Sequence, residues 1–186
     1  KSRLVTVNLS IQKPSTRTSD LEAITYLRPS RYCQSDEVFQ QARRQFKGLH
    51  GHDLIAAVSE FVSSSTTYTP GLSHGTDSAV TTLMTGQGVC RDYAHVVIAL
   101  LRAMDMPARY AACYAPGLNP MDFHAVAEAY LDGVWYVIDG TRLANRRSLA
   151  RIATGRDAAD CAFLSYHGGF VGLNRMRVDA WVVPEE

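Results

Sequence analysis

The spacing of apolar residues changes abruptly at Pro107, and this change constrains the fold more than any other feature of the chain. Before it, apolar residues recur every three or four positions, as on one face of a helix: Ala94, Val97, Ile98, Leu101 and Met104. After it the period falls to two, which predicts a strand over residues 108–114. Because proline lacks an N–H and clashes with the preceding helical turn, we expect the helix to end just before Pro107.

Two further predicted strands, 123–131 and 134–139, flank an Asp-Gly dipeptide at 132–133, which strongly favours a two-residue hairpin turn. In such a hairpin Leu131 pairs with Val134, so the numbers of paired residues sum to 265. Helices followed by antiparallel strands are typical of the α+β class. The sequence therefore predicts an α+β domain.

Three shorter helices are predicted ahead of the long one. The first is capped by Ser35 or Asp36 and runs to about Phe46. The second is capped by Asp53, and its apolar residues follow at helical spacing. The third is a short helical stretch over residues 77–84.

Both ends of the chain are predicted to be extended. Residues 4–9 alternate in the manner of a strand, and residues 20–26 predict a second one. We therefore expect residues 1–33 to be a β-rich lead-in or the end of an upstream domain, and residues 34–186 to be the main domain. A last alternating strand is predicted over residues 177–183.

The composition limits the class of protein. With 186 residues, 46% of them hydrophobic, the chain can bury a core without disulfide or metal staples. A formal net charge of +1 gives no basic footprint for nucleic acid or anionic lipid, and no apolar run nears the roughly 20 residues of a membrane span. We expect no nucleic-acid and no membrane partner; the oligomeric state is left open.

The four cysteines are widely spaced, without a Cys-x-x-Cys pair: Cys33, Cys90, Cys113 and Cys161. This pattern fits neither a disulfide framework nor a zinc module, so we expect reduced thiols, a cytoplasmic location, and no metal or cofactor. Because the first residue is Lys1 rather than Met, an upstream signal segment is left open.

Cys90 is the cysteine whose position favours chemistry. It follows a glycine-bearing turn, Gly86-Gln-Gly88, and stands at the start of the long predicted helix. A cysteine is a nucleophile only as the thiolate, and the unpaired N–H groups and dipole of a helix N-terminus favour that negative charge. We interpret Cys90 as a candidate thiolate nucleophile rather than a small buried hydrophobic residue.

The predicted hairpin supplies a histidine and a carboxylate on one strand face. Its register places Val126 opposite Asp139, and His124 shares the face of Val126 because side chains alternate along a strand. His124 and Asp139 are then diagonal neighbours, about 7–8 Å apart at the backbone and within side-chain reach. A carboxylate-aligned imidazole is what a Cys-His nucleophile pair requires. A slip of one residue would separate the two side chains.

Four charged residues next to these segments have open roles. Asp92 is interpreted as a first-turn carboxylate stabilised by the helix dipole, with the alternative that it restrains Arg91. Arg156 and Asp157 are either a loop-stabilising pair or part of a cleft edge.

The other histidines are interpreted as structural. His95 lies five residues after Cys90, about 140° around the helix, so it should not face the thiol. His50 and His52 have no neighbouring cysteine or carboxylate to complete a metal site, which favours a surface loop.

Three blocks of sequence together resemble the bacterial transglutaminase-like superfamily of papain-like thiol enzymes: Gly88-Val-Cys90-Arg-Asp-Tyr-Ala-His95, Asp122-Phe-His124-Ala and Trp135-Tyr-Val-Ile-Asp139. Similarity continues at Tyr26-Leu-Arg-Pro-Ser-Arg-Tyr-Cys33 and Gly155-Arg-Asp-Ala-Ala-Asp160, so the resemblance covers about residues 24–170. It implies a papain-like core in which residues 34–186 are the catalytic domain. Two departures are Val126, where the family commonly has Trp, and Gly140, where it has Pro.

The resemblance also implies roles for the site. Cys90 would be the nucleophile, His124 the base and later the acid, and Asp139 the residue that orients the imidazole. The backbone N–H of Cys90 is an expected oxyanion donor. We expect a hydrolase, a peptidase or amidase acting on a peptide or other amide through a thioester. The alternatives are a protein-glutamine transglutaminase and a non-catalytic interaction module.

Overall fold

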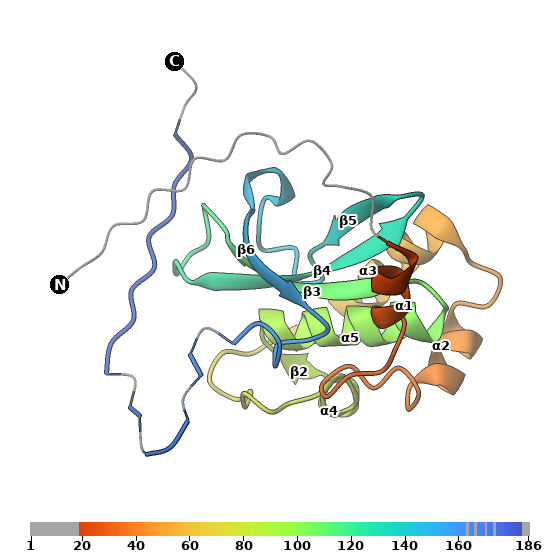
Figure 1. The fold of residues 1–186 in the computed structure, drawn as a ribbon, viewed down its shortest axis with the longest axis horizontal. Helices are drawn as coiled ribbons and strands as arrows, with labels where there is room; N and C mark the ends of the chain where they lie inside the picture. Colours follow the sequence, from red (N-terminus) through yellow and green to blue (C-terminus); the bar gives the residue numbers. More distant parts are fainter. Residues whose placement is uncertain (1–18, 163, 166, 170, 173, 184–186) are drawn as a thin grey trace.

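The computed structural model describes residues 19–162, 164–165, 167–169, 171–172 and 174–183. Its centre is a four-stranded antiparallel sheet with the strand order β5-β4-β3-β6 (Figure 1). The strands are β3 (Ala108–Tyr114), β4 (Phe123–Leu131), β5 (Val134–Ile138) and β6 (Ala150–Gly155). Helices packed on an antiparallel sheet confirm the predicted α+β class.

The helix α5 (Cys90–Ala103) lies along one face of the sheet and forms the centre of the core (Figure 1). Every side chain from Val96 to Leu101 has an exposed fraction of 0%. A helix whose side chains are apolar on all sides is normally surrounded by other parts of the protein. Helix α5 is accordingly buried more completely than a helix with a single apolar face would be. Alanines of β3 and β4 belong to the same core cluster, and their small side chains let the helix lie close to the sheet.

The remaining elements surround α5. They are α1 (Asp20–Thr25), α2 (Phe39–Gln45), α3 (Gly51–Ser65), β1 (Thr67–Tyr68), α4 (Ala79–Thr85), β2 (Gln87–Gly88) and the 3-10 helix η1 (Arg146–Ser148). Strands β1 and β2 form a separate parallel pair next to the start of α5.

The three short helices predicted between residues 35 and 84 are present, but their starts differ from the predictions. Helix α2 begins at Phe39 because the four residues before it form a hydrogen-bonded turn. Asp53 lies in the first turn of α3 and not at its cap. Helix α4 is capped by Ser78, whose Oγ accepts a hydrogen bond from Thr81 N at 3.3 Å.

The hairpin has the predicted register. Leu131 pairs with Val134 and Ala127 with Ile138, so the numbers of paired residues sum to 265 as expected. The turn residues Asp132 and Gly133 have φ angles of 51° and 83°. A two-residue turn that matches the right-handed twist of the two strands needs a positive φ at both positions, which explains why an Asp-Gly pair occupies them.

The strand predicted over residues 20–26 is wrong, because this segment is the helix α1. Ser19 accepts a hydrogen bond from the backbone N–H of Glu22 at 3.2 Å. Serine followed three residues later by glutamate is a helix-start signal, and here it outweighs the alternation of apolar residues. The strand predicted over residues 4–9 lies outside the described residues, and the division into residues 1–33 and 34–186 remains a prediction.

Two predictions for the C-terminal part were also incomplete. Residues 177–183 are not a strand, since they pair with no strand in the part of the chain that the structure describes; Arg177 instead pairs with Asp179. Strand β6 was not predicted, and it completes the sheet beside β3 with a register irregularity between Ala112 and Cys113. Its side chains do not alternate between buried and exposed, so a search for period two misses it.

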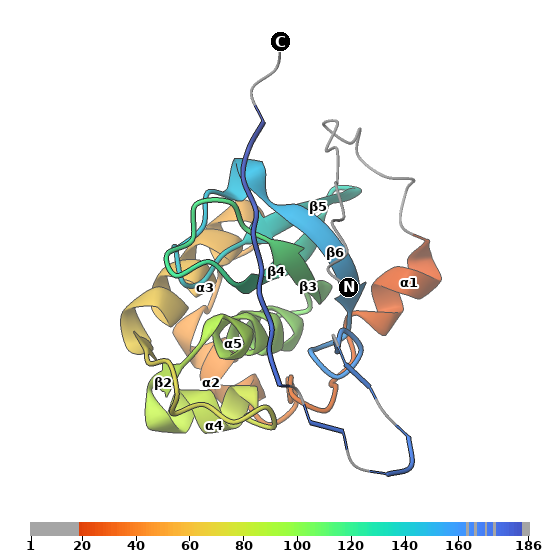
Figure 2. The ribbon, with the colours of Figure 1, turned by 90° about the vertical axis from the view of Figure 1, so that its left-hand side faces the viewer.

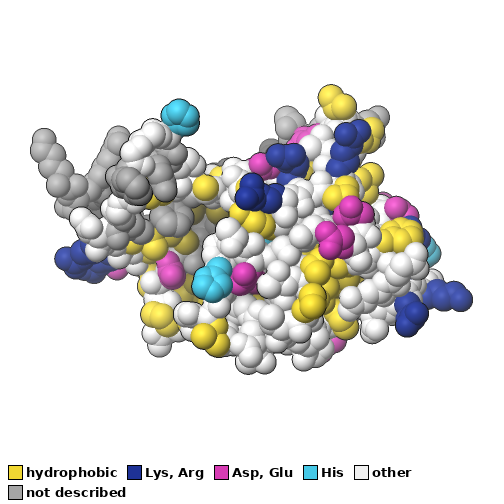
Figure 3. Space-filling view, turned by 90° about the horizontal axis from the view of Figure 1, so that it is seen from below, with side chains coloured by type: hydrophobic (Ala, Val, Ile, Leu, Met, Phe, Trp, Pro, Cys, Tyr) yellow, Lys and Arg dark blue, Asp and Glu magenta, His cyan; other side chains and the backbone are white. Residues whose placement is uncertain are grey.

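The surface carries charges of both signs. In the view of Figure 3 acidic and basic side chains are interspersed over the face seen from below. Within the described residues, no helix combines the length and the apolar character that a membrane span requires. The expected absence of nucleic-acid and membrane partners and the cytoplasmic location remain predictions.

Candidate active site

Cys90 is the first residue of α5, and its side chain is partly exposed. The chain reaches it through Gly86, which ends α4 at a φ of 65°, and through the extended residue Val89. At Gly88 an added Cβ would lie 2.7 Å from Cβ of Asp92, so no larger residue fits there. The glycine turn therefore brings the chain close to the first turn of α5 and places Cys90 at the N-terminus of this helix.

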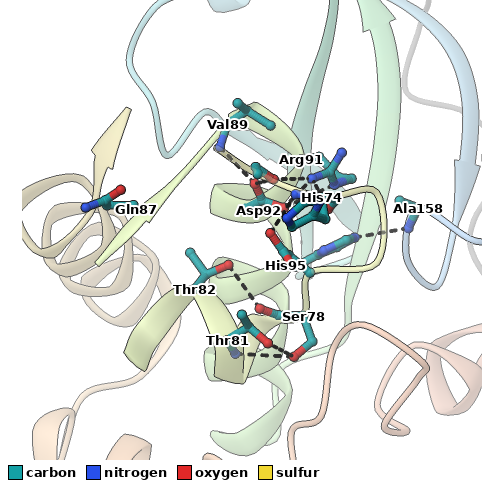
Figure 4. Close-up of polar contacts among 12 residues, drawn as sticks. His74, Ser78, Thr81, Thr82, Gln87, Val89, Arg91, Asp92, His95 and Ala158 are labelled. Carbon is teal, nitrogen blue, oxygen red and sulfur yellow. Dashed lines mark hydrogen bonds and ion pairs between the residues drawn. The ribbon is translucent and has the colours of Figure 1, made fainter. Parts of the chain in front are cut away.

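The carboxylate of Asp92 fastens this turn (Figure 4). Its Oδ2 accepts hydrogen bonds from Val89 N at 2.8 Å and from Ser73 Oγ, and its Oδ1 accepts one from Arg91 Nε at 3.0 Å. Arg91 also donates to Ser73 Oγ and to the carbonyl of His74. Asp92 thus both occupies the first turn and restrains Arg91, and the pair ties the segment of Ser73 and His74 to the start of α5.

The structure brings His124 and Asp139 together as the hairpin register predicts. His124 Nε2 lies 3.1 Å from Asp139 Oδ2, and both side chains are buried, with exposed fractions of 1% and 2%. Nε2 makes no well-aligned hydrogen bond, so the contact is an ion pair held by charge and proximity. Cys90 lies close enough for its charge to act on the His124 ring. Because Nε2 faces Asp139, Nδ1 is the ring nitrogen left for the thiol.

Backbone and hydroxyl donors hold the Asp139 carboxylate in place. Oδ1 accepts hydrogen bonds from Thr141 N at 3.0 Å and from Thr141 Oγ1 at 2.7 Å, and Oδ2 accepts one from Ala144 N at 3.0 Å. Thr141 and Ala144 were not predicted as part of the site. A Thr two residues after an aspartate is a weak turn signal that could have pointed to the first of them.

The electrostatics of this pair favour a charged imidazole. Burial alone lowers the pKa of His124, but the contacts with Asp139 and Cys90 outweigh it and raise the pKa to about 9. Burial likewise raises the pKa of Asp139, but His124, Thr141 and Ala144 together bring it below its usual value. At neutral pH the pair is therefore an imidazolium facing a carboxylate, and an imidazolium is the usual partner of a thiolate nucleophile.

The other three cysteines lie in surroundings that keep their thiols protonated. Burial raises the pKa of Cys33 and of Cys113 to about 12, and that of Cys161 to about 11. All four cysteines are free thiols. Of the four, Cys90 is the one whose charge raises the pKa of His124.

The comparisons with known proteins agree with this geometry. The model of the transglutaminase-like superfamily matches residues 39–140, more than half of the chain, and includes all three residues of the candidate site. The chain belongs to the transglutaminase-like superfamily. A protein from Cytophaga hutchinsonii, provisionally named a cysteine protease, is 42% identical and superposes with a TM-score of 0.75 over 78% of this chain and 53% of that one. Family and relative together support a thiol-dependent enzyme.

Two further proteins are similar at lower identity. The periplasmic domain of TgpA from Pseudomonas aeruginosa is 24% identical, with a TM-score of 0.53 over 67% of this chain and 50% of its own, and it shows the fold. An uncharacterised protein of Mycobacterium leprae is 26% identical over 148 residues, which are 73% of this chain and 52% of the relative. The chain thus spans about half the length of these relatives.

The two departures from the superfamily pattern lie in packed positions. Val126 has an exposed fraction of 2% and packs with Ala111 and Cys113. At Gly140 an added Cβ would lie 3.4 Å from Cγ2 of Val97 and 3.5 Å from Cβ of Tyr93, so the glycine lets this segment lie against α5. Neither departure removes a polar group from the candidate site.

His95 and Asp157 are structural, and they join one loop to the core. His95 Nε2 accepts a hydrogen bond from Ala158 N at 3.2 Å, and burial lowers the pKa of this histidine to about 3, so its ring is neutral (Figure 4). Asp157 is buried and accepts a hydrogen bond from Tyr32 N at 2.9 Å. Arg156 pairs with Asp160 rather than with Asp157, and each of the two residues stabilises the loop, which favours the loop-stabilising alternative over the cleft edge.

His50 and His52 lie at the start of α3, and both are exposed. The predicted surface loop holds for the cap residue His50 and is wrong for His52, which lies in the first turn of the helix. The ring of His52 packs edge-on against Tyr136 at 4.8 Å between centroids. No group of three or more potential ligands that could hold a metal ion occurs among the residues described.

Proposed function

We propose that this chain is a thiol-dependent hydrolase, a peptidase or amidase, with Cys90 as nucleophile, His124 as general base and acid, and Asp139 as the group that orients His124. The observation that supports it most is the buried ion pair of His124 and Asp139, 3.1 Å apart, in contact with a cysteine at a helix start. Cys90 is the first residue of α5, His124 is the second of β4, and Asp139 directly follows β5. Figure 2 shows α5 between the sheet and the helices α2 and α4.

The proposed reaction has two steps. Cys90 Sγ bonds to the acyl carbon while the carbonyl electron pair moves to the oxygen; as the carbonyl re-forms, the C–N bond breaks and His124 gives its proton to the leaving amine. The product is a thioester on Cys90. His124 then takes a proton from water, the hydroxide attacks the thioester carbon, and the acid leaves as the thiolate is restored.

The Cys90 backbone and the Asp139 side chain stabilise the charges that form in these steps. The first backbone N–H of α5, that of Cys90, donates to the oxygen that becomes negatively charged. Asp139 keeps its charge throughout, and its contact with Nε2 stabilises the imidazolium and holds the ring so that Nδ1 serves the thiol. We prefer water as the acyl acceptor because it is always available and no amine-binding motif is visible in the sequence.

Incubation with casein and a fluorescent primary amine separates hydrolysis from acyl transfer. We expect new peptide ends or released ammonia to exceed incorporated amine by at least about tenfold, with both signals lost in a Cys90→Ala control. Both quantities come from the same reaction, by mass spectrometry and by fluorescence of the precipitated protein. Amine incorporation faster than hydrolysis would make the chain a transglutaminase, and neither signal with any amide or ester would favour the non-catalytic module.

A further inference from the structure

Tyr68 lies beside the nucleophile although twenty-one residues separate the two in sequence. It belongs to β1, which pairs in parallel with β2, and its register partner is Gly88. Thr67 N donates to Gly86 O at 2.8 Å and Thr69 N donates to Gly88 O at 2.9 Å. The backbone of Tyr68 is thus fixed on both sides to the turn that leads into Cys90.

Helix α5 holds Tyr68 from a second direction. Tyr93, three residues after the nucleophile, donates its hydroxyl proton to the carbonyl of Thr66 at 2.5 Å, and its ring centroid is 6.1 Å from that of Tyr68. Tyr68 nevertheless keeps an exposed fraction of 40%. The backbone of Tyr68 is therefore held in place while part of its ring is exposed to solvent. A side chain that binds a substrate needs both properties.

The hydroxyl of Tyr68 reaches the site itself. The backbone amide of Cys90 and the charges of Cys90, Asp122 and Asp139 all act on it, which places the hydroxyl near the start of α5. Burial, followed by these negative groups, raises the pKa of Tyr68 despite the opposing effect of the amide. The phenol therefore keeps its proton at neutral pH and remains a hydrogen-bond donor.

We propose that the Tyr68 hydroxyl and the Cys90 backbone N–H together bind the oxyanion formed when Cys90 attacks an acyl carbon. The inference rests on the proposed function. The carbonyl oxygen would lie between the hydroxyl and the amide and accept a hydrogen bond from each as its charge develops. Tyr68 keeps its proton throughout, so it stabilises the intermediate without acting as an acid.

A Tyr68→Phe variant tests this, because it removes the hydroxyl and keeps the ring that packs on Tyr93. With p-nitrophenyl acetate we expect kcat for acylation to fall by about 10²-fold, as for the loss of one oxyanion donor, with KM changed less than about threefold. Alkylation of Cys90 by iodoacetamide passes through no oxyanion, so its rate should stay within about twofold of the wild type. Tyr130→Phe, whose ring packs on Trp135, is the matched control and should match the wild type in both reactions.

Each other outcome overturns the inference in a recognisable way. Wild-type acylation in Tyr68→Phe would remove the hydroxyl from the reaction, and faster acylation would mean that it blocks the Cys90 amide. Equal losses in acylation and alkylation would assign Tyr68 to the placement of Cys90 alone. If the wild type forms no thioester on Cys90, the proposed function fails first, and that result differs from any defect confined to the variant.

Discussion

A Cys90→Ala variant is expected to fold like the wild type and to lose at least about a thousandfold of its acyl-cleaving activity, because no other group in the site can form the thioester. The side chain lies partly exposed at the start of α5. Its removal should therefore cost about 1 kcal/mol of packing or less. Thermal unfolding and turnover of p-nitrophenyl acetate measure the two effects on the same preparation.

The matched control is Cys161→Ala. Cys161 is also partly exposed, but burial of its thiol raises the pKa to about 11, so it should be unreactive at neutral pH. This variant should keep wild-type turnover. Loss of the fold in Cys90→Ala would show that Cys90 is a core residue, and full activity in Cys90→Ala would move the chemistry elsewhere.

An Asp139→Asn variant is expected to lose about 10²- to 10⁴-fold in kcat, because it removes the charge that stabilises the imidazolium. It should also be less stable by about 1–3 kcal/mol. The carboxylate accepts three hydrogen bonds from Thr141 and Ala144 and faces His124 Nε2. The side-chain amide introduced by Asp139→Asn would point its own N–H groups at one of these donors, so at least one of the hydrogen bonds would be lost.

The pH profile gives this prediction a second readout. In the wild type the imidazolium persists until the pH approaches about 9, so kcat/KM should fall as the pH rises through that value. Asp139→Asn removes a cause of the raised pKa of His124, which should move the falling limb to lower pH. Asp132→Asn, at the positive-φ hairpin turn, removes a carboxylate far from the site and should leave the profile unchanged. An Asp139→Asn variant with near-normal turnover and an unshifted limb would remove Asp139 from the mechanism.

The core of the site could be predicted because its geometry is local. The Asp-Gly turn at 132–133 fixes the pairing of β4 with β5, and that register places His124 and Asp139 within reach of one another. The start of α5 is equally local, since a glycine turn precedes an apolar helical period. The predicted end just before Pro107 is wrong, because α5 stops at Ala103 and Asp105 has already left the helical conformation with a φ of 61°. The contact between Cys90 and His124 is not local, so it was inferred from the resemblance to a family.

The missing parts depend on contacts between distant segments. Tyr68 reaches Cys90 only because a two-residue strand pairs with β2, and such a strand is too short to show a period. Glu128 is 1% exposed, and it is tolerated inside the sheet because Arg109 Nε donates to it at 2.7 Å from the neighbouring strand. A partner nineteen residues away cannot be read from the pattern around either residue.

The rates at which iodoacetamide alkylates the four cysteines, measured separately by peptide mass spectrometry at neutral pH, decide whether Cys90 is the nucleophile. We expect Cys90, beside the imidazolium of His124, to react at least about 10²-fold faster than the other three, whose pKa values burial raises to about 11 or 12. A Cys90 that reacts no faster than Cys161 would contradict its identity as the nucleophile.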